Sequence, residues 1–304
     1  MDLDSRLETD LQGPFEARYQ AFLETIATLR PKLHRYCSRM TGSVMDGEDV
    51  VQEALFQAYR TLDSFDDSRP LTPWLFRIAH NRCIDFLRRR AVREDAEAAV
   101  EEPEPVMPVE PALGRAVEHL VLSLPPKERA CVLLKDVFDY SLEEIAELVD
   151  STVGGVKAAL HRGRAKLPAA PVRREPRPAR DESEMQILHL YVDRFNRQDW
   201  EGLRELIADD ARLRVADRYT GRFADAPYFF NYQRWPVPWH LEVGEVDGEP
   251  VILTRLREAD GSETRVVARL EVSGNRVTRI TDYIHCPWVV PAAASAVVDP
   301  SWFH

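Results

Sequence analysis

A short run of basic side chains near the middle of the chain has the composition of a DNA-reading surface. Its members are Lys157, His161, Arg162, Arg164 and Lys166. The spacing of Val156 and Leu160 predicts a helix over 153–167, with these two residues on its buried face and the basic residues outside. A helix that presents only positive charge suits the major groove of DNA, where phosphates and base edges are within reach.

The residues just before this run predict a shorter helix over 142–149. Ser141 stands at its start and Glu144 follows three residues later, which is the pattern of a capping box. Ser151 and Thr152 interrupt the apolar spacing and can cap the following helix. Two helices joined by a tight turn form a helix-turn-helix; the alternative is a surface helix that is basic by chance.

Two earlier predicted helices carry charges of opposite sign. The first, over 45–65, has an acidic and polar face near its start, formed by Asp46, Glu48, Asp49, Gln52 and Glu53. This face can bind a basic partner, or it can simply place acids where the helix dipole favours them.

The second helix, over 74–90, combines Trp74 with arginines and follows a polar loop over 66–73. This combination suits single-stranded nucleic acid, because bases stack on aromatic rings while guanidinium groups bind phosphates. The alternative places Trp74 in a core and leaves the arginines in solvent.

The composition limits the other chemistry. The chain has 304 residues and a formal net charge of −11, so contacts with DNA must come from local basic patches. Its four cysteines are scattered, and buried, reduced thiols are expected. The pairs His34 with Cys37 and His80 with Cys83 would offer four zinc-type ligands if their helices packed side by side. Zinc fingers do not use this pattern, so we predict neither a metal nor a cofactor.

No apolar run approaches the roughly 20 residues of a membrane span. The N-terminus is acidic and polar, unlike a signal peptide. We therefore expect a cytoplasmic protein with no membrane partner.

Breaks in the apolar periodicity predict a multidomain protein. We expect a helical domain over 14–91, an acidic linker over 92–112, a second helical domain over 113–167, a Pro- and Arg-rich linker over 168–180, and a third domain with a tail over 181–304. In the third domain, helices precede alternating strands. The expected fold class is thus two all-α domains followed by an α+β cone around an antiparallel sheet.

Such a cone can enclose a pocket. Its acid–base candidates are Asp210, Asp217, Tyr283 and His285. Its aromatic candidates are Phe230, Tyr232, Trp235, Trp239 and Trp288. No spacing among them identifies a catalytic pair. The apolar tail from residue 286 onward is expected to pack back on the cone or on the helical domains.

The helical domains resemble bacterial RNA polymerase sigma factors of the extracytoplasmic-function (ECF) group. Residues 46–54, DGEDVVQEA, are similar to the family's DAEDLVQE signature, and residues 72–90 to its WLxxIAxNxxxDxxRR helix, both in region 2. The stretches LPPKER at 124–129 and YSLEEIA at 140–146, then Val156-Lys157, follow the order of region 4.

The resemblance implies partners for these residues. The acidic face of residues 46–53 would dock on the clamp helices of the polymerase β′ subunit, and region 4 on the β flap. Region 2 would melt the −10 promoter element, hold its unpaired strand and place a flipped base in a loop pocket. The implied −10 residues are Phe65, Asp66, Ser68, Arg69, Trp74, Arg77, Asn81, Arg82, Asp85, Arg88 and Arg89.

The recognition helix would read the −35 element. The implied residues are Ser151, Thr152, Gly155, Lys157, His161, Arg162 and Arg164. Lys157 and Arg164 would bind phosphate, and Arg162 a base edge. Gly155 stands where the family usually has threonine, which removes a hydroxyl and lowers helix propensity.

Residues 191–213 resemble SnoaL-like domains of the nuclear-transport-factor superfamily, over about 182–286. The combination implies a transcription initiation factor, not an enzyme, that its own C-terminal domain regulates through intramolecular contact. Two alternatives remain open at this point. One is a cyclase-like or isomerase-like enzyme with a borrowed DNA-binding module, and the other is a DNA-binding regulator that does not use polymerase.

Overall fold

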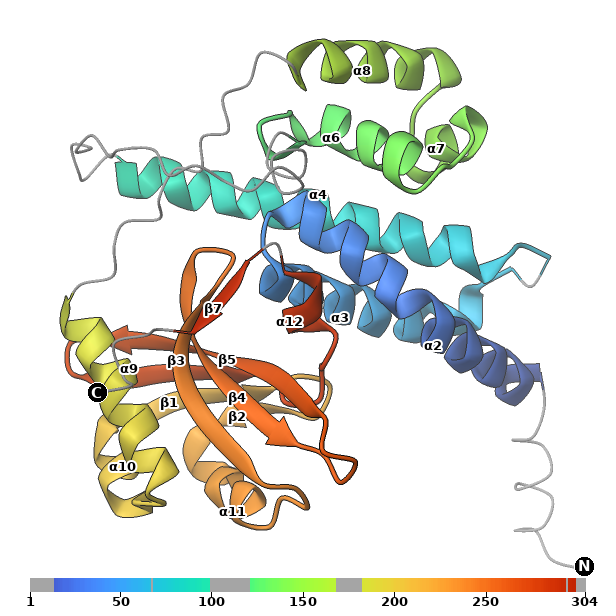
Figure 1. The fold of residues 1–304 in the computed structure, drawn as a ribbon. Helices are drawn as coiled ribbons and strands as arrows, with labels where there is room; N and C mark the ends of the chain where they lie inside the picture. Colours follow the sequence, from blue (N-terminus) through green and yellow to red (C-terminus); the bar gives the residue numbers. More distant parts are fainter. Residues whose placement is uncertain (1–13, 67, 99–120, 168–181, 294, 299–304) are drawn as a thin grey trace, which may run out of the picture. The chain divides into compact units, whose positions relative to one another are not determined.

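The computed structural model describes residues 14–66, 68–98, 121–167, 182–293 and 295–298. The chain forms two compact units, residues 1–174 and 175–304. The first is helical, and the second contains a sheet with helices (Figure 1). None of the helices in the described ranges is long and apolar enough to cross a membrane.

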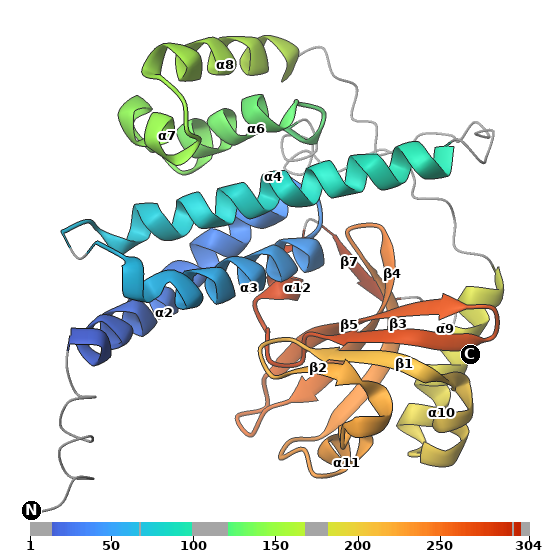
Figure 2. The ribbon, with the colours of Figure 1, turned by 180° about the vertical axis from the view of Figure 1, so that it is seen from behind.

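The helical unit begins with three long helices. They are α2 (Pro14–Thr41), α3 (Val44–Thr61) and α4 (Leu71–Ala98), with the short 3-10 turn η1 (Leu62–Ser64) after α3. α2 continues through Pro31, and α4 runs alongside α3 (Figure 2).

Helices α2 and α3 pack antiparallel. Arg30 Nη2 lies 2.5 Å from Glu48 Oε1, and His34 Nε2 lies 2.9 Å from the Val44 carbonyl oxygen. At the other end, the Arg18 guanidinium donates to the carbonyl oxygen of Asp63 at 3.0 Å. These contacts fix which residues of the two helices lie opposite one another.

The predicted loop before α4 and the end of that helix need correction. Leu71, Thr72 and Pro73 belong to α4, because proline is tolerated in the first turn of a helix, where backbone N–H groups lack intrahelical partners. The helix also continues past Arg90 to Ala98, into the predicted acidic linker, because this stretch is rich in residues with high helix propensity. The rest of that linker, the first residues (113–120) of the predicted second helical domain, and the linker 168–180 lie outside the described residues.

The helix-turn-helix prediction is confirmed. The module consists of α6 (Pro126–Val132), the π-helical turn η2 (Leu133–Val137), α7 (Leu142–Leu148) and α8 (Val153–Lys166). Ser141 and Glu144 form both hydrogen bonds of a capping box. Thr152 caps α8 by accepting a hydrogen bond from the Gly155 N–H at 3.0 Å.

One buried arginine joins this module to the long helices. Arg129 of α6 donates to the carbonyl oxygens of Met40 at the end of α2, Leu122 and Leu124. Burial, together with the nearby Arg90, lowers the pKa of Arg129 to about 10, so the side chain stays charged at neutral pH. Arg129 thereby donates a hydrogen bond to the Met40 carbonyl oxygen, which lies in the last turn of α2 and has no intrahelical partner.

The second unit starts with helices that precede the sheet. They are α9 (Glu182–Asn196) and α10 (Trp200–Leu206). The strands are β1 (Ile207–Val215), β2 (Tyr219–Arg222), β3 (Trp239–Val246), β4 (Glu249–Arg257), β5 (Glu263–Ser273), β6 (Arg276–Asp282) and β7 (Ala296–Val298). The short elements η4 (Phe223–Asp225) and α11 (Tyr228–Gln233) follow β2, and α12 (Val289–Ala292) follows β6.

The sheet has the order β2-β1-β6-β5-β4-β3-β7. The expectation of a wholly antiparallel sheet is wrong at one pair, because β1 and β6 run parallel, with Leu213 opposite Ile280. These strands are far apart in the chain, so no hairpin turn constrains their relative direction. β2, α11 and β7 were not predicted.

Helices α9 and α10 lie on one face of the curled sheet (Figure 1). Between them and the strands, rings pack edge to face, with the Phe195 centroid 4.9 Å from Tyr232 and 5.3 Å from Trp239. The tail packs back on its own unit over residues 289–298, where Val289 is buried and β7 pairs with β3. Trp302 and Phe303 lie outside the described residues.

A buried carboxylate lies inside this aromatic core. Asp282 Oδ2 accepts hydrogen bonds from the hydroxyls of Tyr228 at 2.6 Å and Tyr232 at 2.7 Å, and Oδ1 accepts from the Ile284 N–H at 2.9 Å. Burial raises the pKa of Asp282, although these hydrogen bonds act in the opposite direction. Asp282 continues the inward alternation of Ile280 along β6 and into Ile284.

The raised pKa predicts how the stability of the C-terminal unit depends on pH. The native state holds the Asp282 proton more tightly than the unfolded chain does. Its stabilising contribution is therefore complete below about pH 4, the unfolded carboxyl pKa, and is lost as the pH rises through the native pKa. The variant Asp282→Asn lacks this titration, so the wild type should lose thermal stability relative to it across that window.

Tryptophan fluorescence can follow this transition, because five of the six tryptophans follow residue 175 and only Trp74 belongs to the helical unit. The same scan on Asp225→Asn, an exposed residue of η4, serves as the control. Melting curves of wild type and Asp282→Asn that stay parallel from pH 4 to pH 8 would contradict the prediction.

Candidate nucleic-acid and polymerase interfaces

The acidic face of α3 is only partly available to a partner. Glu53 is exposed, Asp49 and Gln52 are half-buried, and Asp46 and Glu48 are buried, Glu48 in an ion pair with Arg30. Glu53 Oε2 lies 3.5 Å from Arg89 Nη2 of α4, but both side chains are about half exposed, so this pair is weak. The structure therefore leaves Asp49, Gln52 and Glu53 on one side of α3, at a spacing of three and four residues.

Some polar side chains of α4 are bonded to other side chains of the protein, whereas others, which we call open, have no such partner among the described residues. Arg82 Nε donates to Gln57 Oε1 of α3 at 2.7 Å, and Arg88 Nη2 lies 3.1 Å from Asp85 Oδ1. Arg77 and Asn81 are exposed, lie one helical turn apart, and have no ion pair or hydrogen bond within the described part of the chain. Two adjacent side chains with open donors can bind a nucleotide without first breaking a protein contact.

The loop before α4 is built around a polar turn and an aromatic pair. Asp66 Oδ1 accepts from the N–H of Ser68 at 3.0 Å and from its hydroxyl at 2.7 Å, and these bonds lower the pKa of Asp66. Arg69 is exposed beside them, with Nε 3.7 Å from Asp66 Oδ2. The rings of Phe65 and Trp74 lie 4.6 Å apart, with Phe65 buried and Trp74 half-buried. Trp74 is thus partly in the core and partly at the surface.

The outer face of α8 carries the predicted DNA-reading residues. Lys157 and His161 are exposed, one turn apart, and unpaired within the described residues. They border a groove of about 600 Å³ between α8, η2 and the start of α7. The groove is lined by Lys135, Leu142, Lys157, Leu160, His161, Arg164 and Ala165. Its lining combines basic and apolar side chains.

The other basic residues of α8 are held by carboxylates. Arg162 Nε lies 2.9 Å from Glu128 Oε1 and Lys166 Nζ 2.7 Å from Glu128 Oε2. Hydrogen bonds from Lys166 and Arg162 lower the pKa of Glu128. On the opposite flank, Arg164 pairs with Asp136. The contacts of Arg162 and Arg164 depend on residues distant in the chain, and sequence reasoning missed them.

The start of α8 is crowded around Gly155. A Cβ atom at this position would lie 2.7 Å from Ser151 Oγ and 3.3 Å from Thr152 Oγ1. A larger residue therefore requires the Ser151 side chain to move. Ser151 is half-buried and Thr152 is exposed, so the Thr152 hydroxyl can both cap α8 and face a ligand.

The two His-x-x-Cys pairs do not form a four-ligand metal site. His34 Nε2 is bonded to the Val44 carbonyl, and His80 Nδ1 lies 2.8 Å from the Tyr36 hydroxyl. Burial lowers the pKa of His80 to about 4, and burial and hydrogen bonding to Cys83 raise the pKa of Cys37. No three of these four side chains bring their donor atoms together.

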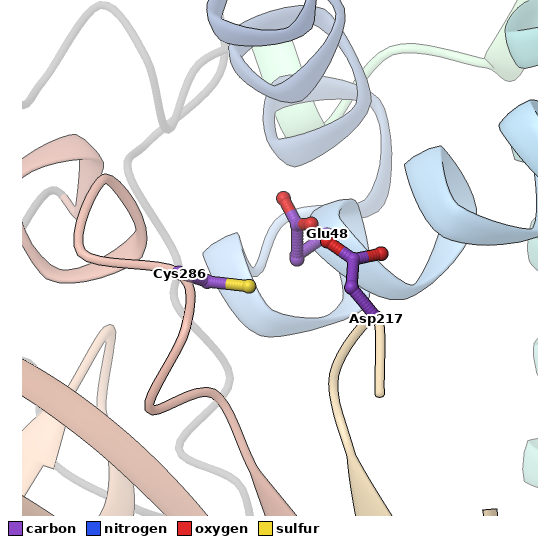
Figure 3. A group of neighbouring side chains, drawn as sticks. All are labelled: Glu48, Asp217 and Cys286. Carbon is purple, nitrogen blue, oxygen red and sulfur yellow. The ribbon is translucent and has the colours of Figure 1, made fainter. Parts of the chain in front are cut away.

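Another set of residues with side chains that can bind a metal is Glu48, Asp217 and Cys286, but these residues belong to different units. Glu48 lies on α3, whereas Asp217 lies in the turn after β1 and Cys286 follows β6 (Figure 3). Glu48 belongs to the helical unit and the other two to the C-terminal unit. Neither unit supplies three ligands from this set.

The acid–base candidates of the C-terminal unit do not form one site. Asp210 and Asp217 are exposed, whereas Tyr283 is buried and His285 is half-buried. Burial, and then Arg218, lower the pKa of His285, while Asp282 and Asp217 raise it. The buried titratable centre is Asp282, which sequence reasoning missed, although its period-2 register with Ile280 was a usable signal.

The aromatic candidates of the C-terminal unit do not line one common pocket. Tyr232 and Trp239 pack in the core, and Trp239 Nε1 donates to the Tyr232 carbonyl at 2.9 Å. Trp235 lies 5.6 Å from the His285 ring, and Phe230 is exposed. Trp288 is half-buried. Tyr232 thus binds Asp282 rather than lining an open pocket.

Comparison with known proteins identifies the helical unit. The model for Sigma-70 region 2 matches residues 25–93, and the model for Sigma-70, region 4 matches residues 114–167. The ECF RNA polymerase sigma factor SigW of Bacillus subtilis (strain 168) is 36% identical over 162 residues, which cover 48% of this chain and 87% of SigW. The ECF RNA polymerase sigma factor SigG of Mycobacterium tuberculosis (strain CDC 1551 / Oshkosh) is 26% identical over 321 residues, covering 93% of this chain and 86% of SigG.

Solved structures resemble both units. The ECF sigma factor SigJ of Mycobacterium tuberculosis is 17% identical and covers 86% of this chain and 95% of its own, with a TM-score of 0.35. A protein described as a ketosteroid isomerase from Kribbella flavida DSM 17836 is 30% identical over 33% of this chain and 76% of its own, with a TM-score of 0.28.

The two regions occur in the family's order, and the similarity to SigW extends over most of that protein. Sigma factors bind core RNA polymerase and promoter DNA and are not enzymes. This chain therefore belongs to the ECF group of RNA polymerase sigma factors, with an added C-terminal α+β domain.

Proposed function

We propose that this sigma factor docks on core polymerase through α3, opens the −10 element with α4 and the loop before it, and reads the −35 element with α8. The C-terminal unit regulates these steps in cis. The observation that carries the proposal is the division of charge in the helical unit. Asp49, Gln52 and Glu53 share one side of α3, whereas the exposed Arg77 lies on α4 and the exposed Lys157 and His161 lie on α8.

The acidic side of α3 suits the clamp helices of the β′ subunit. Asp49 and Glu53 offer carboxylates one turn apart, with Gln52 between them. Complementary charges at such a surface steer association and fix its register. Breaking the exposed Glu53–Arg89 pair costs little, so Glu53 is free to exchange partners.

Arg77 and Asn81 are the best placed residues for the unpaired −10 strand. Both are open on α4, and the half-buried Trp74 lies one turn before Arg77. The polar turn of Asp66 and Ser68 positions the loop that would accept a flipped base. Arg82 and Arg88 would contribute only after exchanging Gln57 and Asp85 for phosphate.

Lys157 and His161 are the first contacts expected at the −35 element, because neither must release a protein partner. Arg164 binds phosphate by exchanging Asp136. Arg162 reaches a base edge only if its ion pair with Glu128 opens, while Lys166 can keep Glu128 neutralised. The apolar lining residues Leu142, Leu160 and Ala165 of the adjoining groove offer a surface on region 4 for the β flap.

The C-terminal unit is better suited to regulation than to catalysis. Its interior is filled by its own aromatic rings, and the buried Asp282 already uses both oxygens in hydrogen bonds. A general acid or base must instead reach a substrate proton. We therefore assign this unit an intramolecular effect on the sigma regions.

Charge reversal on α3 should abolish docking. We expect Asp49→Lys and Glu53→Lys to lower the affinity for core polymerase at least about 10-fold, because each places a cation against a basic partner. Titration of labelled sigma factor with core measures this directly. Glu143→Lys, an exposed acid on α7, is the control. Unchanged affinity for both α3 variants would exclude this docking face.

Phosphate contacts and base contacts at the −35 element should differ in how the affinity for DNA depends on salt and on sequence. Lys157→Ala should weaken binding of holoenzyme to all promoter variants alike and reduce the slope of log K against log salt by about 1. Arg162→Ala should instead relax discrimination at one base pair. The exposed Lys127 on α6 provides the control Lys127→Ala. Equal effects of the Lys157 and Lys127 variants would argue against the assignment.

Removal of the C-terminal unit tests regulation in cis. Run-off transcription with core polymerase should differ between the full chain and a version that ends at Leu167. Equal transcript from both versions would exclude cis regulation. Promoter-independent initiation by both would exclude the proposed promoter contacts.

A further inference from the structure

Large apolar side chains are exposed on the outer surface of α3 and the adjoining part of α2. Phe56 is 63% exposed, Tyr59 49% and Leu23 41%. Phe56 and Val92 are the most exposed large apolar residues of the described helical unit. Contiguous exposed apolar residues mark sites where another molecule binds.

These residues form one patch. The Tyr19 and Tyr59 rings meet edge to face, with centroids 5.8 Å apart, and join α2 to α3. The antiparallel pairing of Arg18 with Asp63 and Arg30 with Glu48 places Leu23 opposite residues 55–58 of α3. We call Tyr19, Leu23, Phe56 and Tyr59 the aromatic patch.

The aromatic patch continues the acidic side of α3. Phe56 lies three residues after Glu53 and seven after Asp49, so all three share one side of the helix. Arg60, one turn further on, lies over the Phe56 ring at 5.8 Å from the centroid. The surface therefore changes from acidic to aromatic along a single helix, with a cation at its end.

We propose that Phe56 is the apolar anchor of the surface with which this sigma factor binds core polymerase, and that Leu23 and Tyr59 surround it. The inference rests on the proposed docking of α3. It extends that site from the carboxylates to the patch beyond them.

The composition of the patch favours this occupant. Interfaces gain most of their affinity from a few aromatic and arginine side chains near the centre, and charged residues at the rim add steering. Asp49 and Glu53 would form such a rim, and Phe56 with Arg60 the centre. The partner surface must then be basic, with an apolar side chain next to its basic residues.

Truncation of the anchor tests the proposal. Phe56→Ala should raise the dissociation constant for core polymerase about 10-fold or more, while Phe56→Leu should stay within about threefold because it remains apolar. Unchanged far-UV circular dichroism and melting temperature would show that the fold is intact. Fluorescence titration of the full chain with core gives the constants.

The C-terminal unit offers a matched control. Phe230 is 52% exposed and Arg234, four residues later, lies 5.2 Å over its ring, as Arg60 does at Phe56. Phe230→Ala should leave the affinity within about twofold. An equal loss for the Phe56 and Phe230 variants would overturn the proposal.

Charge reversal at Asp49 separates this proposal from the one on which it rests. If Asp49→Lys weakens binding and Phe56→Ala does not, the anchor is wrong and the acidic docking face stands. If neither weakens binding, both are wrong. If Phe56→Ala dissolves a homodimer in sedimentation velocity without changing the affinity for core, the patch belongs to a second copy of this chain, and the proposal is overturned.

Discussion

The buried guanidinium of Arg129 sets the architecture of the helical unit. A charged group removed from water requires acceptors, and the carbonyl oxygens of Met40, Leu122 and Leu124 provide them. The end of α2 and the segment before α6 are thereby held together. Around this point, Lys32 lies 4.5 Å over the Tyr140 ring, and the Phe76 ring packs edge to face on Tyr140 at 5.5 Å. The helix-turn-helix is therefore held by its inner side, which leaves the outer face of α8 to solvent.

The same requirement shapes the interior of the C-terminal unit. Asp282 is tolerated among aromatic rings because two tyrosine hydroxyls and one backbone N–H satisfy its oxygens. This arrangement fixes α11 against β6, since both tyrosines belong to α11. A carboxylate that is fully used in this way supports the fold of the cone. In a catalytic pocket the equivalent group would have to remain open to substrate.

On the outer faces, charged residues differ in what they must release before binding. Lys157, His161, Arg77 and Asn81 are open within the described residues, whereas Arg162 shares Glu128 with Lys166. An exchange of one ion pair for another has a small net free energy near the surface, and its sign depends on the competing phosphate or base. Contacts made by the open residues supply affinity, and those made by Arg162 depend more strongly on a well-fitting partner. The open residues can thus position the protein on DNA, while Arg162 contributes to the recognition of sequence.

Local features of the sequence determined the helices, the capping box of Ser141 and Glu144, the helix-turn-helix and the sign of each charged face, because side-chain periodicity and caps act over a few residues. Tertiary structure alone decided the parallel pairing of β1 with β6, the capture of Arg162 by Glu128, the burial of Asp282 and the exposure of Phe56. Each of these depends on residues that are distant in the chain and become neighbours only after packing. The type of a residue limits which groups it can bind. Its contacts in the folded protein determine whether its polar atoms already have partners.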